Sequence, residues 1–554
     1  MLKGHPKGLL VAFFSNMGER FGFYTMMAIL VLFLQAKYDL SAESAGSIYS
    51  WFYFAIYALA LLGGLLADWS KRYKTVILAG IVIMFVGYIF MAIPGLTLTA
   101  TVSSLFVIAF GNGLFKGNLQ AVVGQMYDDP KYDKFRDSAF MLFYMGINIG
   151  AFFAPFVATG IRNWMLRSNG FLHDASLPSL CHQYQNGNMQ NVENLQVLAD
   201  KVNMAGPVSD LGAFVHEYLD VFARGYNYAF GIAAGAMIVS LLVYLIFNRH
   251  LPAKHIEEKK KSENQQVVKM PWSEEKPRLI ALGLVFIVVI FFWMSFHQNG
   301  LTLTMFARDY TVKTVGPFTY LFFDLYQILA FIGAVVGLVL LIIKKSKPTT
   351  KLIGGALFIG LGYLAYYFYS NNGPSNPIEP EIFQSYNPLF IVTLTFLIMG
   401  VFAWLNKRGK EPSTPKKIGI GMIIASLGFV IMIVASLGLV SPIELGGEPV
   451  LEDGRVSPYW LMSSYLILTI AELFLSPMGL SFVSKVSPPR FQGLMQGGWL
   501  LATAIGNKLL FVGSMMWDRI PLWSLWLIFV VCCLVSAAFI FSILKRLERV
   551  TKGA

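Results

Sequence analysis

Charged residues and cysteines are both scarce in this chain, and each scarcity excludes a class of protein. Asp, Glu, Lys and Arg make up 13% of the 554 residues, whereas soluble domains carry about 25%. The three cysteines, Cys181, Cys532 and Cys533, are too few for a disulfide framework. Hydrophobic residues reach 56% and the mean hydropathy is +0.60. The composition therefore predicts a protein with many membrane-spanning segments.

Signatures of catalysis are also lacking. The apolar segments show no cluster of metal ligands, no paired nucleophile and base, and no glycine-rich phosphate loop. We therefore expect no enzyme activity, no cofactor and no metal site. The formal net charge of +12 does not indicate a nucleic-acid partner. Its basic clusters lie between apolar segments, where lysine and arginine favour the cytoplasmic face of a membrane.

About 14 segments of the chain reach the roughly 20 apolar residues that a helix needs to cross a bilayer. The clusters "AKHIEEKKK", "KKSKPTTK" and "NKRGKEPSTPKK" all fall on the cytoplasmic side if both termini are cytoplasmic. The first segment contains Glu19 and Arg20 and lacks a small-residue cleavage site, so we interpret it as a retained helix rather than a signal peptide.

The apolar segments divide the chain into three parts. Residues 1–247 are expected to form an N-terminal six-helix bundle with a long polar external loop at 162–225. Residues 248–277, rich in lysine and glutamate, are expected to form a cytoplasmic linker. Residues 278–554 are expected to form a C-terminal bundle that contains an inserted hairpin at 313–383. The expected fold class is therefore all-α and polytopic.

Four ionisable residues lie well inside the apolar segments. A charge near the centre of a membrane helix costs about 2.5–3.5 kcal/mol on insertion scales, so such residues are functional by default. Glu19 and Arg20 lie in the first segment, Lys116 in the fourth, and Glu472 in "IAELFLSPMGLS". We expect all four to face a shared aqueous cavity. The alternative is that Glu19–Arg20 and Lys116–Glu472 are pairs that only hold helices together.

Several separated motifs carry a family resemblance. "GGLLADWSKRYK" at 63–74 is similar to a cytoplasmic loop signature of the major facilitator superfamily, in which Asp68 caps a helix or pairs with Arg72 to hold a gate. Six further motifs appear along the chain in the family's order: "ERFGFY" at 19–24, "FYMGINIGAF" at 143–152, "YNPLF" at 386–390, "EPSTPKK" at 411–417, "ELFLSPMGLSFVSKVSP" at 472–488 and "GLMQGGWLLATAIGNKL" at 493–509. Together they resemble the proton-coupled oligopeptide transporter (peptide transporter) family of that superfamily.

The resemblance implies two six-helix bundles and import of di- and tripeptides by alternating access. The sequence of this chain adds an inserted pair of helices between the seventh and eighth core helices. It implies short peptides, protons and the lipid bilayer as partners, a monomer, and location in the inner (cell) membrane of a bacterium. The substrate-binding residues that it implies come from both halves: Arg20, Tyr24, Tyr57, Lys116, Asn148, Trp293, Asn387, Glu472 and Trp499. A zwitterionic peptide suits this set, because Arg20 and Lys116 complement its carboxylate and Glu472 its ammonium.

Three residues depart from the charges that the family carries. Asn16 replaces a glutamate and Met27 an arginine, and His297 stands where an acidic residue is common. Because Met27 and His297 remove both partners of one pair, neither leaves a buried charge unpaired. The expected proton-coupling groups are then Glu19, opposed by Lys116, and His297, since imidazole titrates near neutral pH. The alternative is a neutral His297 that only forms hydrogen bonds.

The insertion at 313–383 is the other departure, and it contains two spans near 317–343 and 351–370. We expect these helices to pack at the periphery, with gating or association as alternatives. Two other functions stay open from the sequence. One is a related carrier of another small anion or modified peptide with weak or no proton coupling, and the other is a membrane receptor that does not transport.

Overall fold

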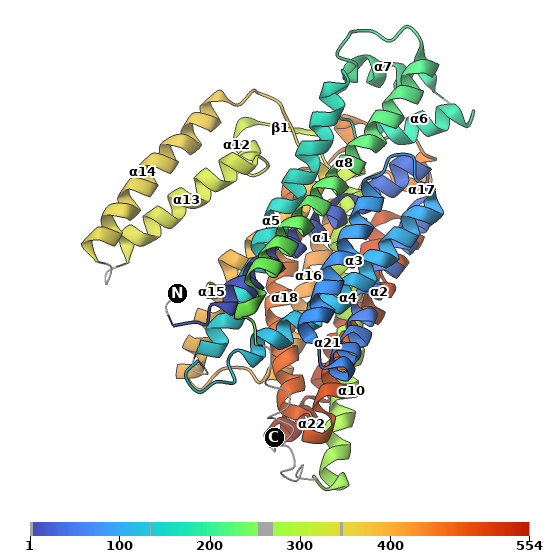
Figure 1. Ribbon diagram of the computed structural model, residues 1–554. Helices are drawn as coiled ribbons and strands as arrows, with labels where there is room; N and C mark the ends of the chain where they lie inside the picture. Colours follow the sequence, from blue (N-terminus) through green and yellow to red (C-terminus); the bar gives the residue numbers. More distant parts are fainter. Residues whose placement is uncertain (1–3, 133–134, 190, 253–269, 344–346, 553–554) are drawn as a thin grey trace.

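The computed structural model describes residues 4–132, 135–189, 191–252, 270–343 and 347–552. Its long helices lie side by side in an elongated bundle (Figure 1). Among the described residues, 14 helical segments are long and apolar enough to cross a membrane. Six come from the first half of the chain, six from the second half and two from the insertion. The expected all-α fold with about 14 spans is confirmed.

The first half contains six spanning helices and two short ones. The spanning helices are α1 (Gly8–Tyr38), α2 (Ala42–Ser70), α3 (Tyr73–Ala92), α4 (Leu98–Gln125), α5 (Arg136–Ser168) and α8 (Leu211–Phe247), and η2 (Asn248–His250) follows. The short helices α6 (Leu177–Gln185) and α7 (Val192–Val202) cover one end of the bundle (Figure 1). We call this the α6–α7 end.

The second half begins with α10 (Trp272–Phe296), η3 (His297–Gly300) and α11 (Thr302–Tyr310), which form one broken span. It continues with η4 (Pro380–Ser385), α15 (Tyr386–Lys407), α16 (Thr414–Ala435), α17 (Pro442–Leu445), η5 (Glu452–Gly454), α18 (Pro458–Val486), η6 (Pro489–Phe491), α19 (Gln492–Lys508), α20 (Phe511–Trp517), α21 (Leu522–Ser542) and α22 (Leu544–Lys552). Helix α22 lies opposite α6 and α7 (Figure 1), and we call this the α22 end.

The insertion is a helical hairpin that projects from the side of the bundle (Figure 1). It contains β1 (Thr314–Val315), α12 (Pro317–Tyr320), α13 (Leu325–Ile342), α14 (Pro348–Asn371) and β2 (Asn376–Pro377). Strands β1 and β2 pair in antiparallel fashion and close its base. Helix α14 has one buried residue, Gly354, which packs against Gly337 of α13. Small residues allow such close approach of two helices in a membrane, so the expected peripheral packing agrees with this arrangement.

Helix ends and crossings follow from local sequence. Ser41 caps α2 by accepting a hydrogen bond from the backbone N–H of Ser44 at 3.2 Å, and Asp210 caps α8 through Ala213 at 2.9 Å. Helices α2 and α4 cross at Gly63, where a Cβ atom would lie 2.1 Å from a backbone oxygen of α4. A side chain at that position would therefore force the two helices apart.

The segment expected to be an external loop is more helical than its polarity suggests. Helix α5 continues to Ser168 and α8 begins at Leu211, so the non-spanning part between them shortens to 169–210 and contains α6 and α7. Asp210 caps the start of α8, and Nδ2 of Asn169 donates to the backbone oxygen of Met165 at the end of α5, so both helices continue beyond their apolar stretch. Of the expected linker at 248–277, residues 253–269 lie outside the described residues, and α10 begins at Trp272.

Candidate functional site

Glu19 and Arg20 form a buried ion pair on α1. Nε of Arg20 lies 2.5 Å from Oε2 of Glu19, and Nη2 lies 2.6 Å from Oε1. The two side chains are 1% and 5% exposed, Glu19 being the more buried. Asn112 of α4 donates a third hydrogen bond to Oε1 at 2.6 Å. Both carboxylate oxygens are therefore bonded within the first half of the chain.

Lys116 on α4 is the second cation of this region. Its ammonium lies 4.0 Å from the ring centroid of Tyr57 on α2, a cation–π contact. Glu19 and Arg20 lie within electrostatic range of Lys116, but no carboxylate of the described residues forms an ion pair with it. The expected opposition of Lys116 and Glu19 is thus electrostatic, without direct contact. The positive charge of Lys116 stays uncompensated by a direct partner.

Glu472 on α18 is the corresponding unpaired anion of the second half. Glu472 is 8% exposed, and its Oε2 accepts a hydrogen bond from Nδ2 of Asn387 on α15 at 3.0 Å. The same amide nitrogen donates to Oγ1 of Thr469, also at 3.0 Å. No cation in the described part of the chain forms an ion pair with Glu472. Asn387 therefore orients this carboxylate without neutralising it.

Tyrosines connect the two halves of the site. Glu472 lies within electrostatic range of Tyr24 on α1 and of Tyr57 on α2, and Tyr24 lies within range of Arg20. The structure therefore brings six of the expected residues into one region between the halves: Arg20, Tyr24, Tyr57, Lys116, Asn387 and Glu472.

Of the other three expected residues, Asn148 borders this region through Tyr144, and Trp293 and Trp499 lie on helices of the second half. Asn148 is buried and donates to the backbone oxygen of Tyr144 at 2.9 Å, and Tyr144 lies within electrostatic range of Glu472. Trp293 on α10 has a buried Nε1 without a hydrogen-bond partner in the described structure. Trp499 on α19 packs on Gly479 of α18, where a Cβ atom would lie 1.9 Å from Cη2 of the indole. Glycine is therefore required at position 479 for this indole position.

The residues that depart from the family are buried, and the cation Lys116 lies within electrostatic range of His297. Met27 is 3% exposed and belongs to the apolar core, and the buried Nδ2 of Asn16 has no partner in the described structure. Nδ1 of His297 lies 2.5 Å from Oδ1 of Asn507, and its ring stacks on Trp293 with centroids 4.7 Å apart. No carboxylate of the described residues lies within ion-pair distance of His297. These contacts are those of a hydrogen-bonding residue.

The expected gate residues lie at the α22 end of α2 and α3. Asp68 is exposed and accepts a hydrogen bond from the hydroxyl of Tyr73. Arg72 is also exposed and precedes the first residue of α3. The structure thus places Asp68 on Tyr73 rather than on Arg72, and the gate role stays a prediction.

A buried ion-pair cluster that the sequence did not reveal joins the two halves at the α6–α7 end. Nη2 of Arg162 on α5 lies 2.8 Å from Oε2 of Glu379, and Nη1 bonds to Glu381. Nδ1 of His173 lies 2.8 Å from the same oxygen of Glu379, and Asn163 donates to its Oε1 at 2.7 Å. The side chains of Arg162 and Glu381 are 0% exposed. We call these five residues the Arg162 cluster.

A second contact between the halves, the ion pair of Lys313 and Asp174, lies beside the Arg162 cluster. Nζ of Lys313 lies 2.7 Å from Oδ1 and 2.8 Å from Oδ2 of Asp174. Burial opposes ionisation of Asp174, but the Lys313 ammonium and the donors of Ser176 outweigh it and lower the Asp174 pKa to about 2. Likewise, burial opposes ionisation of Glu379, but His173 and the Arg162 guanidinium hold the pKa of Glu379 well below its usual range.

The Arg162 cluster and the Lys313–Asp174 ion pair both join the base of the insertion to the first half. Lys313 directly precedes β1, and Glu379 and Glu381 follow β2. The signal in the sequence was an arginine at the end of one apolar segment and two acids in "IEPEIF" before another. Opposite charges at two segment ends do not reveal which ends meet in the fold.

Comparisons with known proteins agree with this geometry. A family model described as the POT family matches residues 73–273 and 370–522, more than half of the chain. An uncharacterized transporter, YclF of Bacillus subtilis (strain 168), is 28% identical over 544 residues, covering 94% of this chain and 89% of the relative. Peptide transporter YePEPT of Yersinia enterocolitica subsp. palearctica is 27% identical over 537 residues, covering 91% and 86%. The fold is similar to a crystal structure of the peptide transporter POT in complex with sulfate, with a TM-score of 0.65, 23% identity and coverage of 99% and 96%.

Proposed function

Because the chain belongs to the POT family and is a transporter rather than an enzyme, we propose that it carries short peptides across a bacterial inner membrane by alternating access. Its named relatives include a peptide transporter. The two six-helix halves would rock around a site between them, as in other transporters built from repeats.

The observation that carries this proposal is the pair of uncompensated charges on opposite halves. Lys116 has no carboxylate partner and Glu472 no cationic partner among the described residues. A buried unpaired charge is costly, so each favours a ligand group of opposite sign. A peptide supplies both, with its carboxylate toward Lys116 and Arg20 and its ammonium toward Glu472. A ligand that touches both halves at once stabilises one arrangement of the halves over another.

The neutral groups of the site suit a broad range of peptides. Asn148 and Asn387 donate and accept hydrogen bonds without a formal charge, which suits the peptide backbone. Tyr24, Tyr57, Trp293 and Trp499 offer apolar faces to ligand side chains. We propose di- and tripeptides as the substrates, because these zwitterions carry one carboxylate and one ammonium for the two unpaired charges.

Proton coupling is the finer part of the proposal. Glu19 is the first candidate, because Arg20 and Asn112 hold both of its oxygens and protonation would release these donors. Release of Arg20 would then change the charge next to Lys116. His297 is the further candidate. Among the described residues His297 has no carboxylate partner, and this, together with Asn16 and Met27, favours the second candidate function, a carrier with weak or no proton coupling.

Orientation completes the proposal. We propose that the α6–α7 end faces the outside and that the α22 end, with the basic helix "LKRLERVTK", faces the cytoplasm. Asp68 and Arg72 would then contribute to closure on the cytoplasmic side. One chain supplies both halves of the site, so a monomer suffices as the transporting unit.

A binding experiment tests the central site. Dialanine and trialanine should raise the melting temperature of the purified protein, whereas alanine and nitrate should not. Both Glu472→Gln and Lys116→Gln should weaken peptide binding by tenfold or more, since each removes a charge-assisted contact. Glu452→Gln, at an exposed position in η5, is the matched control and should bind like the unaltered chain. Equal stabilisation of Glu472→Gln and the unaltered chain by dialanine would contradict the proposal.

A liposome experiment tests the coupling. An inward pH gradient should accelerate dialanine uptake, and Glu19→Gln should abolish that acceleration while counterflow continues. If Glu19→Gln keeps pH-driven uptake, the coupling group lies elsewhere. Uptake without any response to pH or voltage would establish the uncoupled carrier instead.

A further inference from the structure

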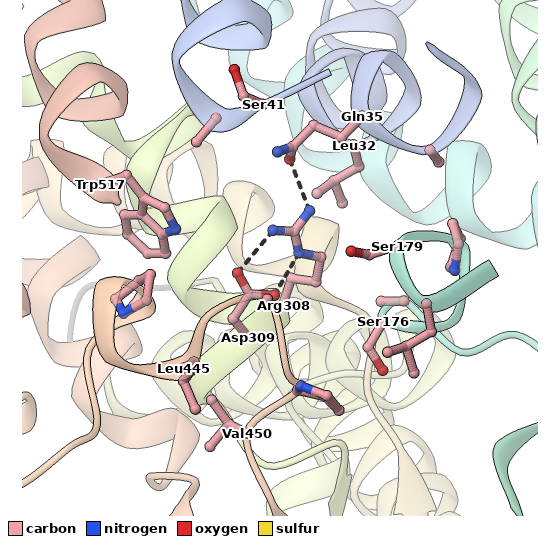
Figure 2. A pocket seen from close by; sticks show the side chains of 18 of the residues that line it. Leu32, Gln35, Ser41, Ser176, Ser179, Arg308, Asp309, Leu445, Val450 and Trp517 are labelled. Atoms are coloured by element: carbon pink, nitrogen blue, oxygen red, sulfur yellow. Dashed lines mark hydrogen bonds and ion pairs between the residues drawn. The ribbon is translucent and has the colours of Figure 1, made fainter. Parts of the chain in front are cut away.

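A cavity of about 370 Å³ lies between the two halves at the α6–α7 end. Ligand pockets in proteins commonly range from about 300 to 1,000 Å³. The ends of α1 and α11, the start of α6, and the segments before α18 and α21 line this cavity. Leu32, Leu445 and Trp517 form apolar parts of its wall, and Ser41, Ser176 and Ser179 line it with hydroxyl groups (Figure 2). Its size and mixed lining are those of a binding site.

Arg308 is the central cation of this cavity, and each of its three guanidinium nitrogens has a hydrogen-bond partner. Nε and Nη2 lie 2.6 and 2.8 Å from the two carboxylate oxygens of Asp309, and Nη1 donates to Oε1 of Gln35 at 2.8 Å (Figure 2). Because Gln35 belongs to α1 and Arg308 to α11, this contact spans the two halves. Arg308 therefore links the two halves at this cavity, and its charge is already compensated by Asp309.

Arg455 is the other cation of the lining, and its charge is not compensated. Its donors bind backbone oxygens only: Nη1 those of Arg308 and Thr311 at 3.2 and 3.1 Å, and Nη2 that of Val450 at 3.2 Å. Nε is buried and has no partner in the described structure. No carboxylate of the described residues forms an ion pair with Arg455. A guanidinium held in place in this way is suited to bind a carboxylate.

Negative charge exceeds positive charge elsewhere in the lining. Asp518 lies near both Asp309 and Arg308, so two carboxylates share one guanidinium. Burial and the Asp309 carboxylate raise the pKa of Asp518 above its usual value, against the effect of Arg308. The backbone N–H of Asp518 donates to the carbonyl oxygen of Met516, but no hydrogen bond or ion pair joins its carboxylate to another described residue. This side of the cavity therefore favours a cationic group.

We propose that this cavity is an outer binding site for a zwitterionic peptide, whose carboxylate binds Arg455 and whose ammonium binds between Asp309 and Asp518. The choice of a peptide as the ligand rests on the function proposed above. The inference that the ligand is a zwitterion rests only on the charges that line the cavity. The site lies between the halves, so a peptide bound there is positioned to enter the central site when the halves separate.

Dialanine binding to the full-length protein in lipid nanodiscs tests the proposal. In a Glu472→Gln background the central site is weakened, and residual dialanine binding should report the outer site. Adding Arg455→Gln should reduce that residual affinity at least tenfold. Adding Arg519→Gln, which removes an exposed arginine at the same end, should leave it unchanged. The unfolding temperature without ligand should be the same for both double variants, and Arg455→Lys should bind with intermediate affinity.

A second measurement needs no change at Arg455. In the Glu472→Gln background, N-acetyl-dialanine and dialanine amide each lack one charge and should bind at least tenfold more weakly than dialanine. The outer site is overturned if Glu472→Gln abolishes all binding, if Arg455→Gln has no effect on the remainder, or if both analogues bind as well as dialanine. If Glu472→Gln instead leaves total binding unchanged, the central site and the proposed function fail, while Arg455→Gln still decides the outer site.

Discussion

Arg162 and Glu379 join the two halves of the molecule through an ion pair of 2.8 Å between Nη2 and Oε2, and the Arg162 side chain is wholly buried. Removing one partner of a buried pair leaves the other charge uncompensated and costs about 3–5 kcal/mol. We therefore expect Arg162→Gln to lower stability by that amount and to favour separation of the halves at the α6–α7 end. Ala42 lines the cavity at this end and is buried. In a chain lacking its native cysteines, a cysteine at Ala42 should therefore react faster with an impermeant maleimide in the Arg162→Gln variant.

The matched control for that variant is a second pair between the halves. Arg519 lies 2.5 Å from Glu43, but the two side chains are 56% and 47% exposed. Exposed pairs contribute about 0–1 kcal/mol, so Arg519→Gln should leave both stability and maleimide reaction almost unchanged. Equal effects of Arg162→Gln and Arg519→Gln would show that the Arg162 cluster does not hold the halves together.

The Asp174–Lys313 pair predicts a pH dependence of stability. The pKa of Asp174 is lowered to about 2 in the folded protein, against about 3.9 in an unfolded chain. A lowered carboxyl pKa contributes stability that is fully present above about pH 4 and is lost as the pH falls toward 2, roughly 2–3 kcal/mol in all. Unfolding temperatures measured from pH 7 to pH 3 should therefore fall more steeply for the unaltered chain than for Asp174→Asn. Parallel curves for the two proteins would contradict this.

Gly479 predicts a steric effect on the central site. A Cβ atom there would lie 1.9 Å from Cη2 of Trp499, so Gly479→Ala must displace the indole. Overpacking of this kind costs about 1–3 kcal/mol, and we expect dialanine affinity to fall at least tenfold. Gly400→Ala on α15, where no atom lies within 4 Å of the new Cβ, should keep both stability and affinity. Unchanged dialanine affinity in Gly479→Ala would exclude Trp499 from the site.

Because the inserted hairpin packs at the periphery, we expect that a variant which separates its two helices still transports. A Cβ atom on Gly337 would lie 2.5 Å from the backbone nitrogen of Phe358, so Gly337→Leu should drive α13 and α14 apart. A Cβ atom on Gly362 would lie 3.9 Å from Cβ of Ala334, which suits a disulfide. Oxidation should therefore cross-link Ala334→Cys with Gly362→Cys, and Gly337→Leu should prevent it.

Gly360→Leu is the control for the hairpin, because no atom lies within 4 Å of a Cβ at that position. It should cross-link like the parent, and dialanine uptake should be equal in all of these variants. Loss of uptake in Gly337→Leu alone would show that the hairpin takes part in the transport cycle.

The fold was predictable from the sequence because membrane spans depend on local composition. Each apolar stretch identifies a helix by its own length. The span around His297, expected near 278–306, extends from Trp272 to Tyr310 and contains an internal 3₁₀ turn. The central charges Lys116 and Glu472 were predictable for the same reason, since a charge inside an apolar helix is conspicuous in one line of sequence.

Contacts between distant segments could not be predicted in this way. Arg162 and Glu381 both lie at the ends of apolar stretches, where charged residues are ordinary, and 219 positions separate them. Their burial results from how α5 meets the segment after β2. Likewise, Asn112 is an ordinary polar residue in sequence, and only the crossing of α1 and α4 brings its amide to Glu19.

Closure at the α6–α7 end by the Arg162 cluster also affects how affinities of this protein are to be interpreted. A ligand added from that side can bind the central site only in the fraction of molecules whose halves are separated there. The apparent dissociation constant is the intrinsic one divided by that fraction, so a fraction of about 1% weakens apparent affinity about 100-fold. A loosened Arg162 cluster would therefore give tighter apparent binding without any change in the residues that contact the peptide.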